Sequence, residues 1–191
     1  MKKLGLFIGR MNPPHKWHIA VIEKALSENE EVLILLWDNW IIDESNPLSF
    51  EQRKKLLAHF FSPLVRGRCP EDRGSVKCLN IDFIKDTKTD LEWVQNIASS
   101  IQKYWNIELN IYWGDFQNDS AILAMKQYEL LLWGKVNYIS VDRFLETVEY
   151  NWEDFHISAT NLRNALRNWN REFVEKFCNE ELVEEILAYF K

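Results

Sequence analysis

The sequence has few cysteines, prolines and glycines and no long apolar run, and these absences exclude several classes of protein. Its 191 residues include three cysteines, five prolines and six glycines. Cys69, Cys78 and Cys178 lack the spacing of metal ligands or redox pairs, so we expect reduced thiols in a cytoplasmic protein. No apolar run approaches the length of a membrane span, and the first apolar run breaks too early for a signal peptide. These features argue against a membrane protein and against a disulfide scaffold.

The chain also lacks an excess of positive charge. Lys and Arg number 23 against 29 Asp and Glu, a formal net charge of −6. General nucleic-acid binders and proteins of acidic membrane surfaces use basic stripes to neutralise phosphates. We therefore expect no nucleic-acid and no membrane partner, while a locally basic nucleotide pocket stays open. Tryptophan, by contrast, is abundant: nine copies can serve the core or line pockets for flat rings.

Apolar runs of strand length alternate with helical patterns along the whole chain. The runs that predict strands cover residues 4–8, 32–36, 76–83, 109–113 and 136–141. A surface loop is expected at 65–75 and a long connection at 142–156, followed by helix with Thr160 as N-cap. This order predicts an α/β fold, a Rossmann-like, doubly wound, mostly parallel five-stranded sheet with C-terminal helices. We expect one domain over residues 1–191, with about 170–191 as a helical extension.

The polar clusters of the sequence follow predicted strands. Gly9 and Arg10 end the first apolar run, and an amphipathic helix begins a few residues later. The first turn of such a helix presents unpaired amides to whatever lies beyond the strand, which favours anions. His15 and His18 are three residues apart on that turn and can point the same way. In doubly wound sheets, ligands bind beyond the carboxyl ends of the strands, so we expect one site there.

Four segments resemble motifs of the nucleotidylyltransferase superfamily, in the family's order. Residues 9–18, GRMNPPHKWH, resemble its signature, in which a glycine after the first strand precedes His-x-Gly-His. Residues 46–53, NPLSFEQR, are similar to Asn-Pro-Phe-Thr-x-x-Glu-Arg, and residues 157–163, ISATNLR, to Ile-Ser-x-Thr-x-Ile-Arg. Asp86 followed by Trp93 is a weaker match. The set looks most like archaeal-type and Nudix-linked nicotinamide-nucleotide adenylyltransferases, and we expect no Nudix domain.

The resemblance implies an enzyme that joins ATP and nicotinamide mononucleotide into NAD and pyrophosphate. The second substrate's phosphate attacks the ATP α-phosphate in line, with Mg²⁺ accompanying ATP, so the protein supplies alignment and charge stabilisation rather than a nucleophile. The implied catalytic residues are His18 at the α-phosphate, His15 assisting it and Arg163 at the outgoing pyrophosphate. The implied contacts to ATP and its phosphates are Gly9, Arg10, His15, His18, Ser158, Thr160 and Arg163. The implied contacts to the second substrate are Arg53, Asp86 and Trp93, and Arg10 serves either phosphate.

Each assignment has a structural alternative. The histidine pair suits an exposed helix face, Arg53 a solvated charge, Asp86 a turn and Trp93 a core anchor. Ser158 and Thr160 are also ordinary helix-capping residues. We predict no metal site in the protein, because His15 and His18 lack further ligands at zinc-binding spacing.

Three departures from the family pattern bear on the substrate. Trp17 stands where the family has glycine, where the nucleotide base lies close to the helix backbone. Residues 37–45, WDNWIIDES, replace a small Gly-Ser turn and add negative charge, and residues 113–117 lack a lysine that some relatives carry. Two alternatives follow: a transferase for another phosphorylated acceptor or for CTP, and a nucleotide-binding or sensory protein without turnover. A homo-oligomeric state stays open.

Overall fold

A computed structural model describes residues 1–38, 40–62, 78–104, 106–114, 119–142, 147–150 and 153–190. The predicted surface loop at 65–75 lies outside these ranges, as do residues 115–117 after the fourth strand and the first two residues of the predicted third strand. None of the helices in the described ranges is both long and apolar enough to cross a bilayer.

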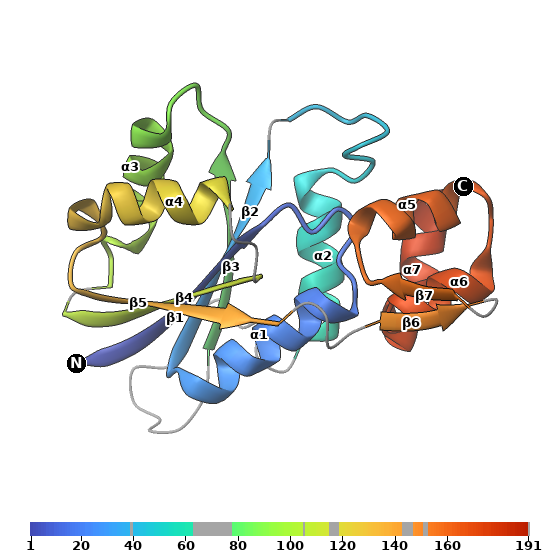
Figure 1. Ribbon diagram of the computed structural model, residues 1–191, viewed down its shortest axis with the longest axis horizontal. Helices are drawn as coiled ribbons and strands as arrows, with labels where there is room; N and C mark the ends of the chain where they lie inside the picture. Colours follow the sequence, from blue (N-terminus) through green and yellow to red (C-terminus); the bar gives the residue numbers. More distant parts are fainter. Residues whose placement is uncertain are drawn as a thin grey trace.

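A five-stranded parallel sheet forms the centre of the fold (Figure 1), in the order β3-β2-β1-β4-β5. Its strands are β1 (Lys2–Gly9), β2 (Glu31–Asp38), β3 (Cys78–Lys85), β4 (Ile107–Gly114) and β5 (Lys135–Val141). In the middle of the sheet Leu6 pairs with Leu33 on one side and Ile111 on the other. Sequence order reverses at β1, so the loops after β1 and β4 leave the same edge in opposite directions. The predicted fold class is confirmed.

Helices cover both faces of the sheet. One face carries α1 (Lys16–Glu28) and α2 (Phe50–Phe60), and the other carries α3 (Asp90–Ile101), α4 (Ser120–Gln127) and the short η1 (Glu129–Leu132). β2 shows why its apolar run is continuous: Val32 and Ile34 pack toward α1 and α2, whereas Leu33 and Leu35 pack toward α3 and α4. A central parallel strand buried on both faces has no polar side to alternate with.

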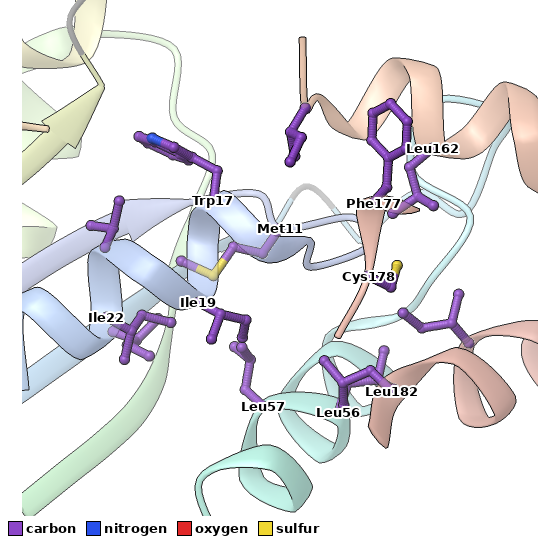
Figure 2. Packing of buried hydrophobic residues seen from close by; sticks show 14 of the residues in the cluster. Met11, Trp17, Ile19, Ile22, Leu56, Leu57, Leu162, Phe177, Cys178 and Leu182 are labelled. Atoms are coloured by element: carbon purple, nitrogen blue, oxygen red, sulfur yellow. The ribbon is translucent and has the colours of Figure 1, made fainter. Parts of the chain in front are cut away.

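The chain ends in three helices that extend the α1 and α2 layer. They are α5 (Ala159–Arg167), α6 (Arg171–Phe177) and α7 (Glu180–Tyr189). Figure 2 shows Leu56 of α2 beside Leu182 of α7, and Phe177 of α6 beside Leu162 of α5, and all four belong to one buried apolar cluster. The part expected to be a helical extension therefore packs into the same core as α1 and α2.

Several local predictions were wrong. The long connection at 142–156 contains an antiparallel hairpin, β6 (Thr147–Tyr150) with β7 (Glu153–His156), whose strands are too short for a clear periodic pattern. The N-cap of α5 is Ser158, not Thr160, because the Ser158 hydroxyl accepts the Asn161 N–H at 3.2 Å. Cys78 is disulfide-bonded, against the expectation of three reduced thiols. Cys178 is free and buried, and burial raises its pKa to about 12.

Candidate active site

The histidine pair lies where β1 passes into α1. His15 is the N-cap of α1 and His18 is in its first turn, and their ring centroids are 3.8 Å apart at an interplanar angle of 35°. The backbone N–H of His15 donates to Nδ1 of His18 at 3.3 Å. A neutral imidazole that accepts at Nδ1 carries its proton on Nε2, so His18 presents a donor on the other side of its ring. His15 is fully buried, whereas 7% of His18 remains exposed.

Hydrogen bonds draw three of the sequence motifs together. Asn12, in the β1–α1 loop, donates through Nδ2 to the Leu48 carbonyl and accepts the Leu48 N–H at Oδ1, both at 2.9 Å. The carbonyl of Asn12 accepts a bond from Arg163 at 2.9 Å. The segments around residues 12, 48 and 163, far apart in the sequence, therefore meet beyond the carboxyl end of β1.

Arg163 is held at the start of α5 as a half-buried cation. Its second terminal nitrogen donates to Thr160 Oγ1 at 3.1 Å. Burial lowers the pKa of Arg163, and the nearby charges of Arg167 and Arg10 lower it further. Two guanidinium groups close enough to act on a third make a region that favours a polyanion.

Arg53 is placed differently from a free phosphate ligand. It is 1% exposed, and its guanidinium pairs with Asp38 at 2.6 Å. The other bonds of this guanidinium run to the backbone carbonyls of Ser49, Arg10 and Trp37. Burial lowers its pKa, while Asp38 opposes that shift. Its predicted contact with the second substrate stays a prediction.

Asp86 and Trp93 both line one cavity of about 80 Å³, together with Trp37, Thr89 and Ser120. The ring centroids of Trp37 and Trp93 are 5.4 Å apart. Within the described part of the chain, neither indole N–H has a hydrogen-bond partner. The cavity thus combines aromatic walls with an exposed carboxylate, a suitable lining for a flat polar ring.

Arg10 contributes to the same region through Trp37. Its guanidinium lies over the Trp37 ring, 5.4 Å from the centroid. The predicted second strand ends at residue 36, but Trp37 is the penultimate residue of β2. Trp37 and Asp38 are the site residues that sequence reasoning missed. Their position directly after the apolar run of β2, at the edge where ligands bind, is the signal that could have found them.

An acidic loop, residues 40–46, lies against α5. The carbonyl of Glu44 accepts a hydrogen bond from Arg167, and its carboxylate lies 4.0 Å from the same guanidinium. The negative charge of Asp43 acts on Arg163. The charge expected from the sequence therefore faces two arginines of the candidate anion region, where bound phosphates would compete with it.

Trp17 is buried beside the histidines. It is 5% exposed, packs edge-on to Phe7 at 5.9 Å, and its ring centroid lies 5.5 Å from that of His18. In Figure 2 it extends from one side of α1 while Ile19 extends from the other. The Trp17 ring is therefore packed into the protein and does not point out into solvent.

In the described ranges, no group of three or more His, Cys, Asp or Glu side chains is arranged to hold a metal ion. Asp38, a carboxylate near the site, is already paired with Arg53. Mg²⁺ bound to a nucleotide takes most of its ligands from phosphates and water. The residues present thus fit an ion that arrives with the nucleotide.

A doubly wound parallel sheet with histidines, arginines and helix starts at its carboxyl edge defines a Rossmann-like class of nucleotide-binding protein. The Cytidylyltransferase-like family matches residues 6–165. The chain therefore belongs to this family, within the nucleotidylyltransferase superfamily, which confirms the resemblance drawn from the motifs.

Similar proteins carry adenylyltransferase names. A nicotinamide/nicotinic acid mononucleotide adenylyltransferase of Acinetobacter baylyi is 22% identical over 189 residues, 97% of this chain and 92% of the relative. A bifunctional NMN adenylyltransferase/ADP ribose pyrophosphatase from Francisella tularensis superposes with a TM-score of 0.67 at 20% identity. This chain is covered completely and spans 52% of the Francisella protein. The same enzyme complexed with AMP and a manganese ion gives a TM-score of 0.59 at 20% identity, over 100% of this chain and 51% of that one.

Proposed function

We propose that this protein is a nicotinamide-nucleotide adenylyltransferase that converts ATP and nicotinamide mononucleotide into NAD and pyrophosphate. The observation that carries the proposal is the convergence of the motifs. Asn12 bonds to both Leu48 and Arg163, so the β1–α1 turn, the start of α2 and the start of α5 lie together, which supports a single site there. The family membership and the names of the relatives support the same activity.

The proposed chemistry needs alignment and charge stabilisation. Nε2–H of His18 would donate to the α-phosphate as negative charge builds up in the transition state. His15 packs against that ring and fixes its orientation. Arg163, Ser158 and Thr160 at the start of α5 would hold the β- and γ-phosphates that leave as pyrophosphate, while Gly9 and Arg10 line the end of β1.

The second substrate would occupy the cavity between Trp37, Trp93 and Asp86. A nicotinamide ring can stack on an indole, and its amide can bond with a carboxylate. Arg10, whose guanidinium lies over the Trp37 ring, would then bind that substrate's phosphate. Mg²⁺ bound to ATP would supply further positive charge at the phosphates. The Francisella enzyme complexed with AMP and a manganese ion supports the use of a divalent ion.

Substitution of His18 tests the assigned mechanism. His18→Ala removes one donor to the transferring phosphate, and loss of such a donor lowers kcat by about 10²- to 10³-fold. The measurement is NAD formation from ATP, Mg²⁺ and nicotinamide mononucleotide. His59→Ala is the matched control, because His59 is an exposed residue of α2 that pairs with Glu185. Full activity of the His18 variant would refute the mechanism.

A second candidate function is nucleotide binding without turnover, and the buried Trp17 favours it. The ring takes up space beside His18 that the family's glycine leaves open. Calorimetry with ATP or NAD, run alongside pyrophosphate release over a panel of phosphorylated acceptors with ATP and CTP, separates the possibilities. Binding with no release under any condition supports a sensor. Release with another acceptor or with CTP supports a different transferase.

A further inference from the structure

We propose that Asp38 and Arg53 are positioning residues, whose buried ion pair holds Arg10 and Trp37 in place for the second substrate. The inference rests on the proposed function, because it concerns the second-substrate side of that site. It also assigns Arg53 an indirect action, through the groups that it bonds.

The pair is enclosed by protein. Arg53 is 1% exposed, Asp38 is 8% exposed, and 2.6 Å separates the bonded nitrogen and Oδ2. Removing two charges from water is costly, and apolar side chains of similar volume often give equal or greater stability. Stability alone is therefore a weak explanation for a buried pair at this edge of the sheet. Its geometry is a stronger one.

Arg53 connects three segments that border the site. Nε donates to the Ser49 carbonyl at 3.3 Å, and one terminal nitrogen donates to the carbonyls of Arg10 at 2.6 Å and Trp37 at 3.0 Å. With the bond to Asp38, four of the five guanidinium N–H groups are engaged. A guanidinium that is already bonded in this way is better suited to holding the backbone in place than to binding a phosphate. We call the Asp38–Arg53 pair with these bonds the brace.

Asp38 makes two further hydrogen bonds, one through its side chain and one through its backbone. Its Oδ1 accepts the Trp40 N–H at 2.7 Å, and its carbonyl accepts the Asp86 N–H at 3.1 Å. Asp86 lines the cavity together with Trp37 and Trp93. The side chains of the pair thus connect the ends of β1 and β2 with the start of α2, while the backbone of Asp38 is bonded to the residue that follows β3.

What the brace holds is a stack of three side chains. The Arg10 guanidinium lies over Trp37, and Trp37 lies against Trp93. A ligand with a flat ring in the cavity and a phosphate at Arg10 would contact both ends of this stack. Arg10 and Trp93 would therefore have to be held at the right distance from each other. A shift of about 1 Å in such an arrangement can cost about 100-fold in rate. Correct placement of the Arg10 and Trp37 backbones is therefore expected to matter most for the second substrate.

A double variant, Asp38→Leu with Arg53→Met, removes both charges and keeps apolar volume in the core. We expect the variant to fold with a lowered melting temperature, because the carbonyls of Arg10 and Trp37 lose the Arg53 donor. In the NAD-forming assay we expect the KM for nicotinamide mononucleotide to rise about tenfold or more, and the KM for ATP to change less than about threefold. Glu185→Gln, which breaks the Lys55–Glu185 pair between α2 and α7, is the control and should leave both values unchanged.

Circular dichroism measures the arrangement of Trp37 and Trp93 independently of enzymatic turnover. The close Trp37 and Trp93 rings should give an exciton signal, defined by its loss in Trp93→Phe. We expect the double variant to lose this signal and Glu185→Gln to keep it. An unchanged signal together with an unchanged KM for nicotinamide mononucleotide overturns the inference. Failure of the wild type to form NAD refutes the proposed function instead, and the exciton signal alone then decides whether the pair positions the stack.

Arg53→Lys decides the question if the double variant does not fold. Lysine keeps the positive charge beside Asp38 but cannot reach four acceptors in the geometry of a guanidinium. A raised KM for nicotinamide mononucleotide with a weakened exciton signal supports positioning. Wild-type values for both overturn it.

Discussion

At the scale of single residues, one hydrogen bond from the backbone decides which ring nitrogen of His18 can donate to a ligand. The His15 N–H donates to Nδ1, which directs the proton of the neutral ring to Nε2. The sequence predicted the pair and its shared direction from the three-residue spacing on a helix start. It could not predict the depth of burial or the stacking, because both depend on Phe7 and Trp17 packed around the rings.

Trp17 carries a sharp prediction at this scale. Trp17→Ala should increase ATP affinity by about tenfold, or about 1.4 kcal/mol, because the space beside His18 becomes free for the base. The same change should lower the free energy of unfolding by about 3–5 kcal/mol, since a core aromatic is lost. Calorimetric titration with ATP measures the first effect. Weaker ATP binding would mean that the indole stacks on the base, and Trp169→Ala, at an exposed site, is the control.

At the scale of elements, the start of α5 shows what a motif can and cannot reveal. The sequence indicated a capped helix carrying Arg163 but placed the cap at Thr160. In the structure the cap is Ser158, and the Thr160 hydroxyl accepts from Arg163. Both residues are good caps, and only the extended backbone at Ser158 decides between them. The end of β2 was also misplaced. Trp37 and Asp38 pair with β3, but the polar residues that follow them in the sequence made the strand look shorter than it is.

The cap leads to a prediction for the stability of α5. Ser158→Ala removes the acceptor for the Asn161 N–H and should lower the free energy of unfolding by about 1 kcal/mol. Thr160→Ala should cost less, because its hydroxyl bonds a side chain and caps no backbone group. Urea denaturation of the two variants measures both. A larger loss for the Thr160 variant would contradict the assigned cap.

At the scale of the whole molecule, the alternation of strands and helices was enough to predict the doubly wound sheet. Each buried strand is read from its own apolar run, and parallel order follows from the helical crossovers between strands. The role of the last three helices was less visible, because an amphipathic helix does not reveal which surface it covers. They pack with α1 and α2 in one cluster, next to the segment that supplies Arg163.

This shared core predicts how substitutions in α7 behave. Leu182→Ala should lower the free energy of unfolding of the whole chain by about 2–5 kcal/mol, because Leu182 is fully buried against α2. Leu130→Ala, at a fully exposed leucine, should change it by less than about 0.5 kcal/mol. Far-ultraviolet dichroism and tryptophan fluorescence should report one coincident transition. Separate transitions would contradict the single-domain prediction.

The most direct test of the central claim is NAD formation by the wild-type protein. Purified protein with ATP, Mg²⁺ and nicotinamide mononucleotide should release pyrophosphate and form NAD in equal amounts, and neither product should appear when either substrate is left out. Equal yields follow from in-line attack on the α-phosphate, which makes one molecule of each product per event. Absence of both products, with correctly folded protein and confirmed ATP binding, would contradict the account.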